Sequence, residues 1–168
     1  MDSATPGKPS PLPDMADMFF MVVLLFLISL LPNYVFSDGS SGWHLATGSY
    51  IIDKGAIPYH DFLSYTFAGK PWIVLYWLFD VFMAAADNFG GLNGVALLIS
   101  TIIATLFLLL FERCRKLGCH VFATFFFCLI AAIASTVHWL ARPLVATFIG
   151  VFVFSTTLED FHRRQITT

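Results

Sequence analysis

Four stretches of the sequence contain no aspartate, glutamate, lysine or arginine, and they restrict the chain to a membrane fold. They cover residues 18–37, 92–111, 120–140 and 143–158. A helix that crosses the hydrocarbon core of a bilayer needs about 20 mostly apolar residues. The chain of 168 residues is 58% hydrophobic and 12% charged, whereas a soluble chain is about 45–50% apolar and about 25% charged. We therefore predict an all-α, polytopic membrane protein with four transmembrane helices in a lipid bilayer.

Lysine and arginine are distributed unevenly between the two ends of these predicted helices. If the N-terminus is cytoplasmic, the basic residues inside are Lys8, Arg113, Arg115, Lys116, Arg163 and Arg164, and those outside are Lys54, Lys70 and Arg142. Because cytoplasmic loops carry an excess of lysine and arginine, we predict that both termini are cytoplasmic and that residues 38–91 form an extracytoplasmic loop. Residues 1–17 are predicted to be a disordered cytoplasmic tail, and residues 18–168 a single membrane domain.

The predicted external loop contains two helical patterns that differ from the transmembrane stretches. Residues 43–53 carry apolar side chains at helical spacing and are followed by Gly55 and Pro58, which end helices. Residues 72–87 are apolar but short for a transmembrane helix, and Asp80 lies in their middle. If they crossed the membrane, the most basic turn of the chain would be external, against the usual distribution. We predict two interfacial helices here, with a re-entrant or spanning second helix as the alternative.

The external loop also concentrates the residues that could bind a metal ion or take part in catalysis. Asp38, His44, His60 and Asp61 offer mixed nitrogen and oxygen ligands for a divalent metal. Their spacing matches no compact ligand motif, and polar residues at a hydrated membrane boundary are the alternative. As a general base, Asp38 would need a partly enclosed pocket, and a solvated helix end is the alternative for this residue.

Two other ionisable residues lie within apolar sequence. Asp80 would be costly in a membrane without a polar partner, and Lys70 or Arg142 could form an ion pair with it. His138 lies near the external end of the stretch 120–140. It is a candidate cofactor-binding residue, as an axial ligand of a haem or chlorin, and hydrogen bonding near the interface is the alternative.

Charge and cysteine content argue against two further classes of protein. The net charge of −2 does not suit a nucleic-acid partner. The three cysteines, Cys114, Cys119 and Cys128, lie outside the external loop and include no CxxC spacing. We therefore predict neither a disulfide framework nor a zinc site.

The external loop and the start of the last apolar stretch resemble a known family. The shared pattern reads D…WH-x-x-x-G-x-x-I…G-x-x-P-x-x-D-x-x-S-x-T-x-x-G-x-x-W…W-L, followed much later by an Arg–Pro pair that opens an apolar stretch. The matching residues are Asp38, Trp43, His44, Gly48, Ile51, Gly55, Pro58, Asp61, Ser64, Thr66, Gly69, Trp72, Trp77, Leu78, Arg142 and Pro143. With this ordered set, residues 38–160 resemble the N-terminal part of bacterial polytopic glycosyltransferases of the GT-C type, the superfamily that includes protein O-mannosyltransferases.

The resemblance carries expectations about substrate and site. In that superfamily the sugar donor is linked to polyprenyl phosphate, and an acidic residue at the start of the first external loop acts on the acceptor or helps to hold a divalent metal. By position, this role falls to Asp38 and, as a second choice, to Asp61. The resemblance also implies the bacterial inner membrane as the location. Members have more transmembrane helices than the four predicted here, which implies a truncated scaffold.

Two functions follow from these expectations. One is a non-catalytic accessory subunit, in which the truncated scaffold packs against partner subunits of a larger membrane complex. The other is a glycosyltransferase, or half of one, that transfers a sugar from a polyprenyl-phosphate donor on the extracytoplasmic face. The scarcity of polar residues in the later predicted spans favours the accessory subunit, because a substrate pathway through a helix bundle needs polar side chains.

Overall fold

The computed structural model describes residues 14–30 and 32–167, and it is helical apart from the connections and an isolated antiparallel bridge between His60 and Pro71. The elements are α1 (Met15–Leu30), α2 (Pro32–Val35), α3 (Ser40–Lys54), α4 (Trp77–Lys116), α5 (Val121–Ser135), the 3₁₀ helix η1 (Thr136–His138) and α6 (Leu144–Thr167). The predicted all-α fold is confirmed. Most of the predicted N-terminal tail, residues 1–13, lies outside the described residues, and α1 already begins at Met15.

Three helices are long and apolar enough to cross a membrane by length and composition. They are Trp77–Lys116, Val121–His138 and Leu144–Gln165. The apolar helix α1 has 16 residues, and at a rise of about 1.5 Å per residue it is shorter than a hydrocarbon core of about 30 Å. The described residues therefore contain three helices that could cross a membrane, where the sequence predicted four.

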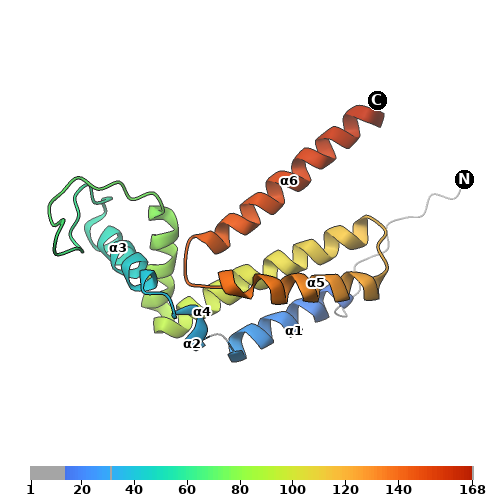
Figure 1. The fold of residues 1–168 in the computed structure, drawn as a ribbon, viewed down its shortest axis with the longest axis horizontal. Coiled ribbons are helices and arrows are strands. Elements are labelled where there is room, and N and C mark those ends of the chain that lie inside the picture. The colour runs from blue at the N-terminus through green and yellow to red at the C-terminus, as the bar shows by residue number, and fades with distance from the viewer. Residues whose placement is uncertain (1–13, 31, 168) are drawn as a thin grey trace, which may run out of the picture.

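Residues 77–87 of the predicted interfacial helix and the predicted transmembrane helix at 92–111 lie in α4, as two helical parts joined at a sharp kink, whereas residues 72–76 precede the helix. The kink lies at Gly90 and Gly91, and Gly91 has a φ of 60°, which favours glycine. A Cβ atom at Gly94 would lie 2.2 Å from the carbonyl oxygen of Ala86, so the corner also requires glycine there. Figure 1 shows the first half of α4 beside α3 and the second half running along the helix bundle.

The second half of α4 is the centre of the bundle, since α1, α5 and α6 all pack against it. Its buried side chains include Ile99, Ile103 and Phe107. Near its end, the ring of Phe111 stacks on the ring of Phe19 from α1, with 4.9 Å between centroids. Burial of such side chains contributes about 1.5–3 kcal/mol each relative to exposure in water, and in a bilayer close packing takes over this role.

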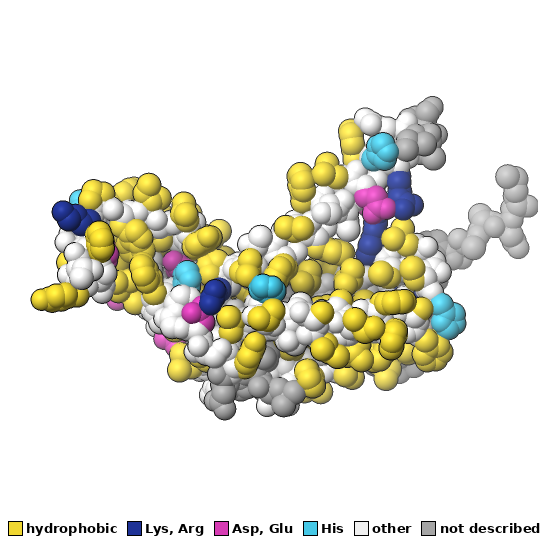
Figure 2. Space-filling view, viewed as in Figure 1, with side chains coloured by type: hydrophobic (Ala, Val, Ile, Leu, Met, Phe, Trp, Pro, Cys, Tyr) yellow, Lys and Arg dark blue, Asp and Glu magenta, His cyan; other side chains and the backbone are white. Residues whose placement is uncertain are grey.

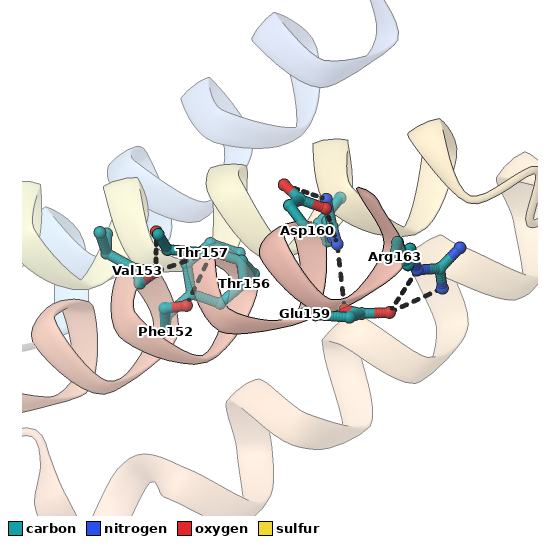
Figure 3. Close-up of polar contacts among 8 residues, drawn as sticks. Phe152, Val153, Thr156, Thr157, Glu159, Asp160 and Arg163 are labelled. Carbon is teal, nitrogen blue, oxygen red and sulfur yellow. Dashed lines mark hydrogen bonds and ion pairs between the residues drawn. The ribbon is translucent and has the colours of Figure 1, made fainter. Parts of the chain in front are cut away.

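Helix α6 leaves the other helices of the bundle at an angle (Figure 1). Near its far end, the guanidinium of Arg113 reaches from α4 to Asp160 and Glu159, with N–O distances of 2.7 Å and 3.0 Å. Within α6, the Thr156 and Thr157 hydroxyls donate to carbonyl oxygens one turn earlier, as Figure 3 shows. These internal hydrogen bonds satisfy hydroxyl groups that would otherwise lack a partner in lipid.

Candidate functional site

The predicted site residues lie mainly in a subdomain that we call the cap, which consists of α3, the connection 55–76 and the first half of α4, residues 77–89. Figure 2 shows charged side chains in the cap, where the cap meets the bundle, and near the far end of α6, with mostly hydrophobic side chains elsewhere on this face. The predicted helix at 43–53 lies within α3. It ends where predicted, at Gly55, whose φ of 63° provides a left-handed C-cap.

Close approach of α3 and α4 fixes the geometry of the cap. A Cβ atom at Gly48 would lie 1.9 Å from the carbonyl oxygen of Asp80 and 2.8 Å from the Cβ atom of Ala84. Real Cβ contacts are not this short, so the two backbones can meet in this way only if residue 48 is glycine. The neighbouring residues Thr47 and Ile51 of α3 are also buried.

This helix contact brings together His44 and Asp80, a pair that the sequence analysis did not identify. Nδ1 of His44 lies 2.7 Å from Oδ1 of Asp80, and Asp80 is 2% exposed. The predicted partners of Asp80, Lys70 and Arg142, were therefore wrong. Arg142 pairs elsewhere, and a histidine one helix away is close enough to satisfy the buried carboxylate. The available sequence signal was a single acid in an apolar helix, which indicates a partner without identifying it.

The His44–Asp80 pair has a geometry that serves both structure and chemistry. Toward an ionised Asp80, which only accepts hydrogen bonds, Nδ1 of His44 is the donor, and Nε2 is directed away from Asp80. The His44 side chain is 16% exposed, and the edge of its ring meets the ring of Tyr76, with 6.2 Å between centroids. Carboxylates orient catalytic and metal-binding histidines in the same way, and buried polar pairs also specify how two helices pack.

Asp38 forms an ion pair that connects the start of α3 to the segment before α6. Its Oδ2 pairs with Nε of Arg142 and also accepts a hydrogen bond of 2.6 Å from the Ser40 hydroxyl. Its Oδ1 accepts the backbone N–H of Ser40 at 3.2 Å. Both carboxylate oxygens are thus engaged within the chain. A role as base or metal ligand would require Asp38 to exchange these contacts for a substrate or an ion.

Asp61 shapes the connection between α3 and α4. Its carboxylate accepts hydrogen bonds from the Ser64 hydroxyl and from the backbone N–H groups of Ser64 and Leu63. These donors, led by the Ser64 hydroxyl, lower the pKa of Asp61 below its ordinary value of 3.8. The backbone of the same residue pairs with Lys70 and Gly69. Asp61 is therefore an ionised turn residue that holds this loop closed on itself.

Aromatic side chains attach this loop to α3. The ring of Trp72 lies 5.6 Å from Trp43 and 6.1 Å from Phe62, and Phe62 stacks on Tyr50 at 4.4 Å between centroids. Such pairs contribute about 0.5–1.5 kcal/mol beyond the area that they bury. The cluster makes the cap one packed unit.

The predicted metal and cofactor ligands are not assembled into one cluster. Asp38 pairs with Arg142, His44 with Asp80, and Asp61 with Ser64, and residues 14–30 and 32–167 include no group of three or more His, Cys, Asp and Glu side chains that could hold a metal ion. His138 is exposed on η1, with its ring 6.0 Å from that of Phe148.

Comparisons with known proteins add no assignment to this geometry. The chain matches no protein-family model, no curated protein and no solved structure. The function is therefore inferred below from the contacts described above.

Proposed function

We propose that the chain is a non-catalytic scaffold subunit of a larger membrane complex, and that α6 binds a transmembrane helix of a partner subunit. The observation that carries this proposal is the exposure of α6. Only 6% of the most apolar segment of α6 is buried inside the chain, whereas 44% of the corresponding segment of α4 is buried. An apolar helix that is so little buried against its own chain exposes a surface that other proteins can contact.

The surface of α6 favours a helix as its partner over lipid alone. Ala146 and Gly150 are both exposed and lie four residues apart, on one side of the helix. A Cβ atom at Gly150 would meet no atom within 4 Å. In a membrane, helices associate where small residues let their backbones approach closely, since lipid tails are as apolar as leucine and provide no hydrophobic driving force. The pair Ala146–Gly150 supplies such a surface.

Substitution of Gly150 by leucine tests this proposal. The open space above Gly150 accommodates the larger side chain, so the chain should fold, whereas a partner helix would be held away. We expect Gly150→Leu to reduce the amount of a defined partner subunit that copurifies in mild detergent by about tenfold, the effect of losing about 1–2 kcal/mol of helix packing. A photo-crosslinking residue at Val153, one turn further along, should identify the same subunit. Ala134→Leu, a similar enlargement at an exposed position of α5, is the control and should copurify normally.

The proposal includes a topology. In it, α1 and α2 together form a fourth membrane crossing, both termini are cytoplasmic, and residues 38–91 lie on the extracytoplasmic face of the bacterial inner membrane. The cap and the basic α4–α5 turn lie at opposite ends of the bundle (Figure 1). This arrangement supports a topology in which the cap is extracytoplasmic and Arg115 and Lys116 are cytoplasmic.

A second candidate function, sugar transfer from a polyprenyl-phosphate donor, is favoured by the Asp38–Arg142 contact. Both residues belong to the pattern shared with GT-C transferases, they are far apart in the sequence, and they are paired in space. In such a reaction the acceptor hydroxyl would give its proton to Asp38 while its oxygen forms a bond to the anomeric carbon. The bond from that carbon to the phosphate oxygen would break, and the polyprenyl phosphate would leave next to the Arg142 guanidinium.

A transfer assay separates the two candidate functions. If the chain is a scaffold, the purified chain is expected to transfer no sugar from a polyprenyl-phosphate donor to any acceptor of a bacterial membrane extract. Transfer that falls by about a hundredfold or more in Asp38→Asn, the usual scale for loss of a general base, and persists in Asp53→Asn would contradict the scaffold function. Asp53 is an exposed acid at the end of α3, so the second variant controls for the change of charge.

A further inference from the structure

A groove at one end of the bundle has the shape and polarity of a phospholipid site. The start of α1, the end of α4 and the start of α5 meet at this end (Figure 1). Between them lies an open apolar groove of about 310 Å³, lined by methionine, valine and phenylalanine side chains that include Met18, Val22 and Phe122. The stacked rings of Phe19 and Phe111 are its buried floor. An acyl chain is the natural occupant of such a groove in a bilayer.

The groove continues into a pocket that is lined in part by charged side chains. This second pocket, of about 510 Å³, shares Met15 and Phe111 with the groove. Its charged lining consists of two acids and two bases, namely Asp14, Glu112, Arg115 and Lys116. An apolar channel that opens onto balanced charges matches one acyl chain joined to a head group that carries both a phosphate and an amine.

We propose that this composite site binds a phospholipid of the phosphatidylethanolamine class. Arg115 and Lys116 receive the phosphate, and the primary ammonium donates hydrogen bonds to the carboxylates of Glu112 and Asp14. A phosphatidylcholine head group has the same charges, but its trimethylated nitrogen has no N–H to donate. A phosphatidylglycerol head group has no cation, so it leaves the two carboxylates next to an anion.

The contacts that these side chains already make can be replaced by contacts to a lipid head group. Lys116 and Glu112 form an ion pair of 3.3 Å, with side chains 71% and 41% exposed, and exposed pairs of this kind contribute little stability. One Nη of Arg115 donates to the carbonyl oxygen of Cys119 at 2.5 Å, and a guanidinium has five N–H donors in all. The Asp14 carboxylate accepts the backbone N–H groups of Ala16 and Asp17 through Oδ1, which leaves Oδ2 for the ammonium. The head group can therefore bind without breaking these backbone hydrogen bonds.

Lipid retention by the full chain tests the site. The protein is reconstituted in vesicles with equal amounts of dioleoyl phosphatidylethanolamine, phosphatidylcholine and phosphatidylglycerol, extracted in mild detergent, and examined by native mass spectrometry for bound lipid. We expect phosphatidylethanolamine to be retained about tenfold over either of the others, the difference expected for a hydrogen bond to a charged group. Equal retention of all three lipids, or a preference for phosphatidylglycerol, would overturn the proposal.

Variants locate the site and distinguish head-group from acyl-chain binding. Glu112→Gln should lower the preference for phosphatidylethanolamine over phosphatidylcholine, and the double change Arg115→Gln with Lys116→Gln should lower retention of both. Val22→Trp should fill the groove and release all bound lipid. Arg163→Gln, which removes a positive charge outside both pockets, should behave as the unmodified chain. If the double variant does not fold, an unchanged preference in Glu112→Gln is sufficient to overturn the proposal.

Discussion

Replacing Gly48 with alanine is expected to open the cap while the transmembrane helices remain folded. The added Cβ atom would lie 1.9 Å from a carbonyl oxygen of α4, and the obstacle is backbone, which cannot rotate away as a side chain can. Overpacking of a core usually costs about 1–3 kcal/mol, and a clash between two backbones should lie at or above the upper end of this range. The change should therefore separate α3 from the first half of α4.

Limited proteolysis and hydrogen exchange of the connection 55–76 measure this opening. Gly42→Ala is the matched control, because Gly42 lies in the same helix and an added Cβ atom there meets nothing within 4 Å. The control should be neutral or more stable by up to about 1 kcal/mol, since alanine is a better helix former than glycine. Equal protection of the connection in the two variants would show that α3 and α4 do not meet as described.

The features predicted correctly from sequence are those determined by local composition. The lack of charge in 120–140 and 143–158 predicted two apolar helices, which appear as α5 with η1 and as α6. Apolar spacing in 43–53 followed by Gly55 predicted a short helix and its end, because a left-handed C-cap depends on one residue. Each of these patterns depends only on residues that are close together in the sequence.

The features that sequence analysis missed depend on contacts between distant residues. Neither the spacing nor the type of His44 identifies Asp80 as its partner, because many helix orientations are compatible with the same residues. In the prediction from sequence, one helix ends at residue 87 and the next begins at residue 92, and Gly90 and Gly91 are not identified as a kink. A glycine pair predicts equally well a loop between two helices and a kink within one. The approach of α3 to residues 77–89 decides which side chains meet in the cap, so the His44–Asp80 pair could not be identified before the fold was known.

Replacing His44 with leucine is expected to have the second large effect, a loss of about 3 kcal/mol of cap stability. Asp80 is 2% exposed, and removal of its partner leaves a buried carboxylate without compensation. Leaving a buried charge without its partner in this way costs about 3–5 kcal/mol. The lower value applies here because the His44 side chain is 16% exposed and water can partly replace it. Denaturant titration followed by tryptophan fluorescence would measure the loss, since Trp43 and Trp72 lie in the cap.

A double-mutant cycle shows whether the pair acts through structure alone. If its role is packing, the double change His44→Leu with Asp80→Leu should recover most of the lost stability, because apolar pairs often replace buried charges without cost. His60→Leu, at an exposed histidine of the same cap, should change stability by less than about 0.5 kcal/mol. Should His44→Leu behave like His60→Leu, the pair would not hold the cap together, and an oriented imidazole that contributes no stability would instead point to chemistry at Nε2.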